Sequence, residues 1–388
     1  MDSNSNVDRS KVRGRDLTMG MRLGDSVRVT LFGESHGRGV GALVEGIPAG
    51  TEIDIDVLRD DIERRKPGRK GLSARAESDE CEIISGVHEG KATGWPILLL
   101  TWNSDARSKD YNFLPDQPRP GHADLTEQIR SGGASDLRGG GSQSARLTYG
   151  LVSAASQLRG LLSEAGWRVE AHLHSVGDLV AAPLFGLDRD SVLPEDSTMA
   201  RLNCRDEDTS EKFSSLIEEI RLDQDSIGSS VECIIEGLPL GLGEPWFDGL
   251  EPALARGMMA IPGARAVEFS RGTEASRMRG SEHNDAWHLN GDQPVLSGAE
   301  DASADGALGG RSTGAPMRII VHFKPPSSIA REQSTLHLPS GDQRPLKVPG
   351  RHDPVLGPRA VPVVESIARL VLADLGMIGG YLGVEQSE

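Results

Sequence analysis

The feature that most constrains this chain is a glycine-rich stretch at residues 119–148, RPGHADLTEQIRSGGASDLRGGGSQSARLT. It opens with a Pro-Gly turn that presents His122, and its run Gly139–Gly141 precedes a predicted helix. Glycines ahead of a helix start let the backbone approach a ligand closely, and the first free N–H groups of the helix attract an anion. The stretch therefore predicts an anion-binding site beside a titratable imidazole.

Three arginines flank these turns, namely Arg119, Arg138 and Arg146. Each guanidinium can hold a phosphate or a carboxylate through two parallel hydrogen bonds. Taken alone, the stretch also fits an ordinary glycine-rich loop with solvated charges.

The distribution of charge favours the anion site. The formal net charge of −16 over 388 residues argues against a nucleic-acid partner. Yet arginine and lysine crowd into residues 59–75, 107–146 and 344–359. An acidic protein that concentrates its cations in a few glycine-rich loops is predicted to bind a small anion.

Composition also predicts the surroundings of the protein. No apolar run reaches the roughly 18 residues that a membrane span needs, and the first residues are polar. Cys81, Cys204 and Cys233 are widely spaced and show no metal-ligand pattern. We therefore expect reduced thiols in a cytoplasmic protein, with no metal site and no membrane partner.

Hydrophobic periodicity predicts mixed strands and helices. Strands are expected at 26–32, 42–47, 81–87, 96–102, 167–173, 230–236, 265–270 and 317–323, and helices at 54–66, 144–165, 211–222, 250–261 and 363–375. Residues 188–210 are predicted as a surface loop and 291–314, rich in Gly, Ser, Ala and Asp, as a mobile loop or lid. This pattern predicts an α+β fold with sheets and helices in layers. We expect a single large domain at 21–388 after a disordered extension at 1–20.

A histidine and a pair of arginines elsewhere in the chain also allow more than one interpretation. His36 follows a predicted strand in GESHGRGVG, where a histidine with no role beyond the turn is a reasonable alternative. Arg64 and Arg65 end the helix at 54–66, where basic side chains commonly complement the helix dipole.

A series of motifs runs along the chain in a fixed order. They are FGESHG at 32–37, RRKPG at 64–68, RPGHAD at 119–124, RGGG and SAR within 138–146, GSEHND at 280–285, GALGGRSTG at 306–314, FKPPSSI at 323–329 and GRHDP at 350–354. In order and spacing they resemble the chorismate synthase family over nearly the whole chain.

The resemblance implies an activity and an architecture. The family converts 5-enolpyruvylshikimate 3-phosphate to chorismate by a 1,4-anti elimination of phosphate, a step on the way to aromatic amino acids, and requires reduced FMN. It also implies a layered β-α-β sandwich and a homotetramer. The sequence leaves open whether this chain reduces its own flavin with NADPH.

The resemblance further assigns roles by position. His36 is implied to protonate the departing phosphate, His122 to lie beside the reduced flavin, and Asp353 to help transfer the ring proton. The implied substrate ligands are Arg65, Arg119, Arg146 and Arg351. The implied cofactor ligands are Ser142, Gln143, Ser144, Glu282, His283, Gly309, Lys324, Pro325, Pro326, Ser327, Ser328 and Arg351. The remaining histidines are expected to be structural: His88, His172, His174, His288, His322 and His337.

The chain departs from the family pattern RGGGRSSARET. Ser142 stands where an arginine is expected, and Leu147 where an acidic residue is expected. These departures motivate a second hypothesis, a non-catalytic paralogue that binds flavin or shikimate-type anions. Retention of His36, His122 and Asp353 together favours the enzyme, because a binding module needs none of these groups.

Overall fold

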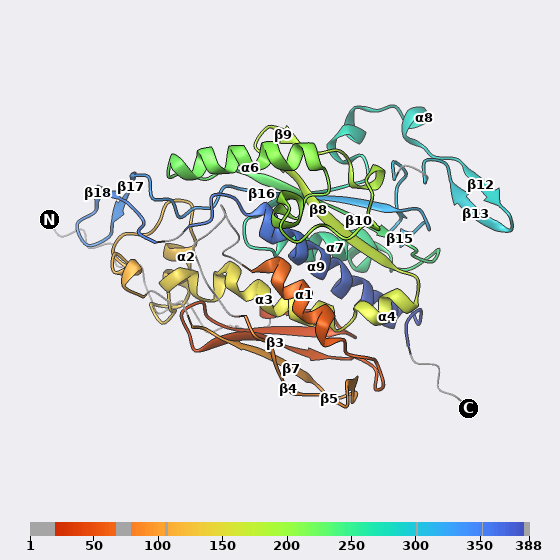
Figure 1. Cartoon of the computed structure of the whole chain (residues 1–388), viewed down its shortest axis with the longest axis horizontal. Coiled ribbons are helices and arrows are strands. Elements are labelled where there is room, and N and C mark those ends of the chain that lie inside the picture. Colours follow the sequence, from red (N-terminus) through yellow and green to blue (C-terminus); the bar gives the residue numbers. More distant parts are fainter. Residues whose placement is uncertain (1–19, 67–78, 105–107, 300–301, 351, 384–388) are drawn as a thin grey trace.

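The computed structural model describes residues 20–66, 79–104, 108–299, 302–350 and 352–383. Figure 1 shows two large sheets with a layer of helices between them. The predicted α+β fold and its β-α-β layering are therefore confirmed. The expected extension at 1–20 lies outside the described residues except for Gly20.

The first sheet is a five-stranded antiparallel sheet near the N-terminus. Its order is β1 (Arg22–Leu23), β2 (Arg28–Gly33), β3 (Gly39–Glu45), β7 (Ile97–Trp102) and β4 (Glu82–Ser85). On β3 and β7 the apolar side chains that face the helices, such as Val40, Ile97 and Leu99, are fully buried. This one-sided burial is what an antiparallel sheet packed on a single face requires.

The second sheet is also five-stranded and antiparallel. Its order is β11 (Ala264–Phe269), β16 (Met317–Phe323), β10 (Ser229–Glu236), β8 (Arg168–Val176) and β9 (Leu179–Val180). The central strand β10 is buried along nearly its whole length, including its polar residues Ser229, Ser230 and Glu232.

Helices fill the space between the sheets. They are α1 (Ile55–Arg65), α3 (Thr148–Ser156), α4 (Arg159–Glu164), α7 (Leu250–Met259) and α9 (Gly357–Ile378). Helix α9 is buried on almost every side because it contacts β8 and β10 on one flank and α1, α3 and α7 on others. One hydrophobic cluster joins both sheets to this layer.

Smaller elements lie around the sandwich. The helices among them are α2 (Asp124–Arg130), α5 (Thr198–Leu202), α6 (Glu207–Leu222) and α8 (Gly280–His283). The strand pairs are β5 (Val87–His88) with β6 (Lys91–Ala92), β12 (Trp287–Asn290) with β13 (Gln293–Leu296), β14 (Ala307–Leu308) with β15 (Arg311–Ser312), and β17 (Gln333–His337) with β18 (Asp342–Leu346). Short 3-10 turns are η3 (Ser108–Tyr111), η4 (Arg138–Gln143), η5 (Ala145–Leu147), η6 (Leu184–Gly186), η7 (Trp246–Asp248) and η8 (Gly272–Arg277).

The long helix predicted at 144–165 is wrong in its extent. Ser144 is extended (φ −72°, ψ 142°), and its hydroxyl accepts a hydrogen bond from the N–H of Arg146. The α-helix begins only at Thr148, and it is interrupted between Ser156 and Arg159 before α4. The apolar repeat continues across that break, which is why periodicity alone predicted one helix.

Three loop and helix predictions are corrected as well. Residues 291–314, predicted as a mobile loop, include β13 and the β14–β15 pair, because glycine turns at 291 and 309–310 allow tight hairpins. The predicted surface loop at 188–210 contains α5 and the start of α6, whose cap Asp206 accepts from the N–H of Thr209. The last helix is longer than predicted, since it begins at Gly357.

The helix predicted at 54–66 is confirmed, and the carboxylate of Asp54 caps it. Leu58 and Ile62 of this helix are buried, whereas Ile55 is 45% exposed. Among all the helices in the described ranges, none has the length and apolar character that crossing a bilayer requires.

Candidate active site

The glycine run forms a tight bend in front of α3. Gly139, Gly140 and Gly141 have φ values of 63°, 102° and 55°. Side chains other than glycine rarely adopt this left-handed region, so three such residues in succession require glycine. The backbone here turns on itself instead of opening a helix directly.

This bend lies between the two predicted catalytic histidines. A Cβ built on Gly139 would lie 2.7 Å from the His36 ring, and one built on Gly140 would lie 3.4 Å from Nε2 of His122. The backbone therefore approaches His36 at a distance that a side chain would obstruct, and it lies in van der Waals range of His122. Positions far apart in the sequence meet at one place, as the anion-site interpretation requires.

The turn that carries His36 is held by Asn103, the residue that follows β7. The side-chain amide of Asn103 donates hydrogen bonds of 3.0 Å to the carbonyls of both Glu34 and Gly37. The buried Tyr111 ring meets the His36 ring edge-on, with centroids 5.1 Å apart. These contacts fix the imidazole next to the glycine bend.

His122 is oriented by a buried carboxylate. Nδ1 of His122 lies 2.8 Å from Oδ1 of Asp124, and Arg119 donates to both oxygens of the same carboxylate at 2.7 and 2.8 Å. Burial by itself would raise the pKa of Asp124, but hydrogen bonds from Arg119 and His122 bring it below its ordinary value. An ionised Asp124 favours a proton on Nδ1 of His122, which leaves Nε2 as the acceptor on the side of Gly140.

The predicted FMN loop after β16 packs against this same turn. Nζ of Lys324 donates to the carbonyl of Gly121 at 2.5 Å and to the hydroxyl of Ser327 at 2.9 Å. The hydroxyl of Ser328 accepts from Arg119 at 3.0 Å. Burial, aided by the nearby Arg265, lowers the pKa of Lys324. An ammonium and two hydroxyls thus gather next to His122, and Pro325 and Pro326 keep the segment that carries them extended.

Two of the predicted substrate arginines meet on one buried carboxylate. Arg65 at the end of α1 donates to Oδ2 of Asp79 at 2.5 Å, and Arg146 in η5 donates to Oδ1. Both guanidiniums also lie over the ring of Tyr149, at 5.7 and 5.6 Å. The side chain of Asp79 is completely buried.

Asp353 lies close to these arginines. Its Oδ2 accepts from Arg359, and Arg359 also donates to the backbone carbonyl of Arg65 at 3.3 Å. The other oxygen, Oδ1, is buried without a hydrogen-bond partner among the described residues. Arg351, expected at both the substrate and the cofactor, lies outside the described part of the chain.

Other predicted cofactor residues occupy two places. Ser142, Gln143 and Ser144 follow the glycine bend directly. Glu282, His283 and Gly309 belong instead to α8 and the β14–β15 turn, at the opposite end of the long axis from α2 (Figure 1). Within one chain these last residues do not join the bend.

A cavity of about 1750 Å³ lies between α1, α6, β8 and α9, lined by many charged side chains. Most of its arginines are paired with acids: Arg64 binds both oxygens of Glu365 at 2.7 and 2.8 Å, and Arg189 binds Glu236 at 2.6 Å. The predicted catalytic residues do not line it. We therefore place the candidate active site at the glycine bend.

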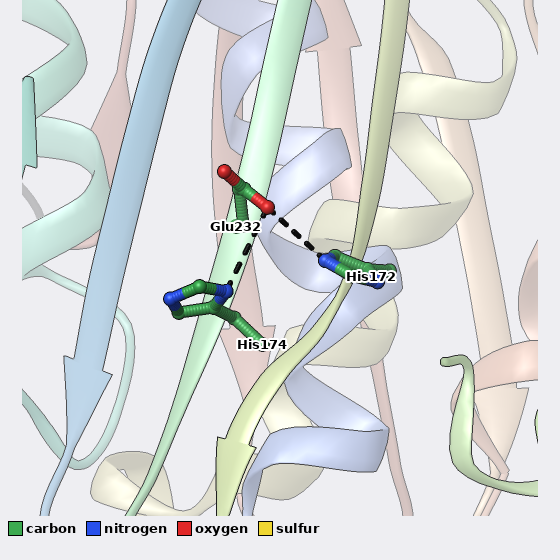
Figure 2. A group of neighbouring side chains, drawn as sticks. All are labelled: His172, His174 and Glu232. Carbon is green, nitrogen blue, oxygen red and sulfur yellow. Dashed lines mark hydrogen bonds and ion pairs between the residues drawn. The ribbon is translucent and has the colours of Figure 1, made fainter. Parts of the chain in front are cut away.

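A second cluster of titratable groups lies on the second sheet. Figure 2 shows His172 and His174 of β8 directed at Glu232 of β10, with nitrogen-oxygen distances of 3.1 and 3.7 Å to one carboxylate oxygen. These atoms could share a metal. However, that oxygen also accepts from the N–H of Leu184 at 2.7 Å, and Arg318 binds the other.

The electrostatics of this cluster also favour an ion pair over a metal. Burial opposes ionisation of Glu232, yet hydrogen bonding from His172 and the charge of Arg318 lower its pKa to about 2. Burial lowers the pKa of His174 to about 4. A divalent cation beside the Arg318 guanidinium would add uncompensated positive charge to a buried site. We interpret the cluster as structural.

Several residues that complete the active site had not been assigned roles from the sequence. Asp79, Asn103 and Tyr111 contact the predicted groups, but each stands 14 or more residues from the partners described above. Arg359 stands only six residues after its partner Asp353. Asp124 is different, because it lies two residues after His122 in the same turn, and that spacing was a usable signal.

Comparison with known proteins shows which family this chain is similar to. The family model described as "Chorismate synthase" matches residues 27–377. The chain is 43% identical over 360 residues to the chorismate synthase of Aeropyrum pernix, covering 91% of this chain and 92% of that one. It is 40% identical over 358 residues to that of Synechocystis, covering 92% and 97%.

A solved structure gives the same result. "Crystal Structure of Chorismate Synthase" matches with a TM-score of 0.69 and 26% sequence identity, covering 92% of this chain and 93% of that one. The match of fold, length and sequence along the whole core leads to one conclusion. The chain belongs to the chorismate synthase family.

Proposed function

We propose that this chain eliminates phosphate from 5-enolpyruvylshikimate 3-phosphate to give chorismate, with its active site at the glycine bend. The observation that carries the proposal is the position of that bend, in contact range of His36 through Gly139 and of His122 through Gly140. A 1,4-elimination needs an acid for the departing phosphate and an acceptor for a ring proton, and such groups accelerate reactions by about 10²–10⁴-fold each.

His36 is the proposed acid and Asp353 the proposed proton acceptor. His36 would donate its proton to the phosphate oxygen as the bond to the ring breaks. Oδ1 of Asp353, buried and without a described partner, would take up a proton. Arg65, Arg119, Arg146 and Arg351 would hold the phosphate and carboxylates of the substrate.

Reduced FMN is the proposed cofactor, and it would supply transient electron density to the substrate when bound. The chemistry of the donors around Gly121 suits its phosphate, since an ammonium and two hydroxyls gather there. Lys324 to Ser328 would hold that phosphate. Ser142, Gln143 and Ser144 would hold the cofactor from the side of the bend, and His122 would contact it through Nε2.

A homotetramer is part of the proposal. Glu282 and His283 belong to α8 and Gly309 to the β14–β15 turn, at the opposite end of the long axis from α2 (Figure 1). A second copy of the chain can bring them to the bend, which would make the cofactor site depend on assembly. We also propose a cytoplasmic location, supported by Cys81, Cys204 and Cys233, which are free thiols.

The test is an anaerobic assay with dithionite-reduced FMN and the phosphorylated substrate, following chorismate absorbance. Turnover supports the proposal. Binding of FMN and substrate without turnover would instead favour the non-catalytic paralogue that the departures at Ser142 and Leu147 suggest.

A further inference from the structure

The residue of interest is Asp79, whose carboxylate joins two arginines from different elements. It lies just before β4, has a left-handed φ of 50°, and exposes none of its side chain. A residue other than glycine in this conformation is strained, and such strain persists only where surrounding contacts compensate for it. Here the compensating contacts are ion pairs to Arg65 and Arg146.

These contacts continue to the turn that carries His36. Arg146 donates from Nη1 to Asp79 and from Nε to the side-chain oxygen of Asn103 at 3.1 Å. The amide of Asn103 in turn holds the carbonyls of Glu34 and Gly37 on either side of His36. The orientation of Arg146 is therefore fixed at two points, one of them shared with the proposed acid.

The charge of the group suits an anion. Two guanidiniums share one carboxylate in a buried place. Burial by itself would raise the pKa of Asp79, but both arginines lower it, so the carboxylate is ionised at neutral pH. Burial raises the pKa of the Tyr149 phenol between them, so that ring adds no negative charge. Guanidiniums held in this way are suited to binding a phosphate or a carboxylate.

We propose that Asp79 is a positioning residue for substrate binding, which orients Arg65 and Arg146 toward an anionic group of the substrate. The inference rests on the proposed function. Asp79 takes one Nη group from each arginine, so a single carboxylate fixes the direction of both guanidiniums. Its complete burial argues that it is a fixed support and does not exchange places with the ligand.

The decisive variant is Asp79→Asn, made in the full-length protein. The amide keeps the size of the side chain but removes the charge that orients both guanidiniums. We expect the KM for the phosphorylated substrate to rise about tenfold to a hundredfold. This change corresponds to the loss of one charge-assisted hydrogen bond. The Kd for FMN is expected to stay unchanged, because the proposed FMN ligands do not touch Asp79.

Glu232→Gln is the matched control. It also removes a completely buried carboxylate that binds an arginine, but on the second sheet. Both variants are expected to lower the melting temperature, and only Asp79→Asn to raise the KM. An unchanged KM in Asp79→Asn, or an equal rise in Glu232→Gln, overturns the inference. Tighter substrate binding also overturns it, because Asp79 would then be competing with the anion.

Two further measurements keep the inference testable. Should Asp79→Asn not fold, Asn103→Ala removes the other tether of Arg146, and an unchanged substrate KM in that variant overturns the inference. Should the wild type form no chorismate, the proposed function itself fails. Calorimetry with inorganic phosphate then tests Asp79 separately: weaker binding by Asp79→Asn supports its positioning role, and equal affinity overturns it.

Discussion

At the residue scale, the two histidines of the site are held by different means. His122 is bound to an ionised carboxylate, whereas His36 lies against an aromatic ring and a glycine backbone. A carboxylate partner stabilises an imidazolium and fixes its tautomer. Hydrogen bonds to a carboxylate therefore orient His122, whereas packing contacts orient His36.

His36→Ala is expected to lower turnover by roughly 10²–10⁴-fold, the usual contribution of one general acid. Binding of FMN and substrate should remain nearly intact, because the arginines and the Lys324 loop are untouched. Steady-state chorismate formation and calorimetry measure the two effects. His88→Ala, at an imidazole 79% exposed, is the control. Wild-type turnover in His36→Ala would rule out the acid role.

Lys324→Ala is expected to weaken FMN far more than substrate. The ammonium lies with Ser327 beside Gly121, and loss of one charge-assisted hydrogen bond should reduce FMN affinity by about tenfold to a hundredfold. Calorimetric titration with FMN measures the change, and Lys212→Ala, on an exposed lysine of α6, controls for lost surface charge. Equal FMN affinity in both variants would contradict a role for this loop in cofactor binding.

At the element scale, two glycines allow the steric requirement for glycine to be distinguished from the conformational requirement. Gly139 and Gly133 both have positive φ, 63° and 88°. A Cβ on Gly139 would lie within 2.8 Å of Ser35 and His36, whereas one on Gly133 meets nothing within 4 Å. The two positions therefore share backbone strain but differ in what a methyl group would displace.

Gly139→Ala and Gly133→Ala should each lose about 1 kcal/mol of stability, the cost of a side chain in this conformation. Only Gly139→Ala is expected to lose turnover, by about a hundredfold, because a displacement of His36 by roughly 1 Å is enough. Urea denaturation and steady-state kinetics measure the two quantities. The same turnover in both variants would mean that close approach of the bend to His36 does not matter.

Elements with local signals could be predicted from the sequence. Strand β16 alternates clearly and was predicted at 317–323, its observed bounds, and Asp54 marked the start of α1. The interruption after Ser156 and the hairpins within 287–312 had no such signal, because they depend on packing and cross-strand pairing. For the same reason the sequence does not indicate the role of Asp79, whose partners come from α1 and η5. The motifs located the two histidines and most arginines, but only the fold revealed what holds them.

At the scale of the whole molecule, buried carboxylates of α9 connect segments that are far apart in the sequence. Glu365 of α9 binds Arg64 of α1, and it also accepts from the backbone of β8 at Ala171. Asp374 of α9 accepts from three successive backbone N–H groups at 25–27, which fastens the chain ahead of β2 to the central helix. Such contacts join residues from both ends of the chain, so their loss should affect the whole fold.

The last prediction concerns acid stability. Burial opposes ionisation of Glu365, but Arg64 and Arg369 lower its pKa to about 2, and Glu232 is likewise lowered to about 2. Because both folded-state pKa values lie below the unfolded value, the unfolded chain binds more protons in acid. The stabilisation is thus complete above pH about 4.5 and is lost as the pH falls toward 2, by an amount on the order of 2 kcal/mol per group.

Urea denaturation from pH 7 to pH 2 measures this loss. The double variant Glu232→Gln/Glu365→Gln should be less stable than the wild type at pH 7, because each change leaves a buried arginine without its counter-ion. Its free energy of unfolding should also fall less steeply below pH 4.5, since the two groups no longer titrate. Glu89→Gln, whose side chain is 86% exposed, should keep the wild-type slope. If the double variant and the wild type lose stability in parallel across this range, other carboxylates control the acid transition and the two buried pairs do not.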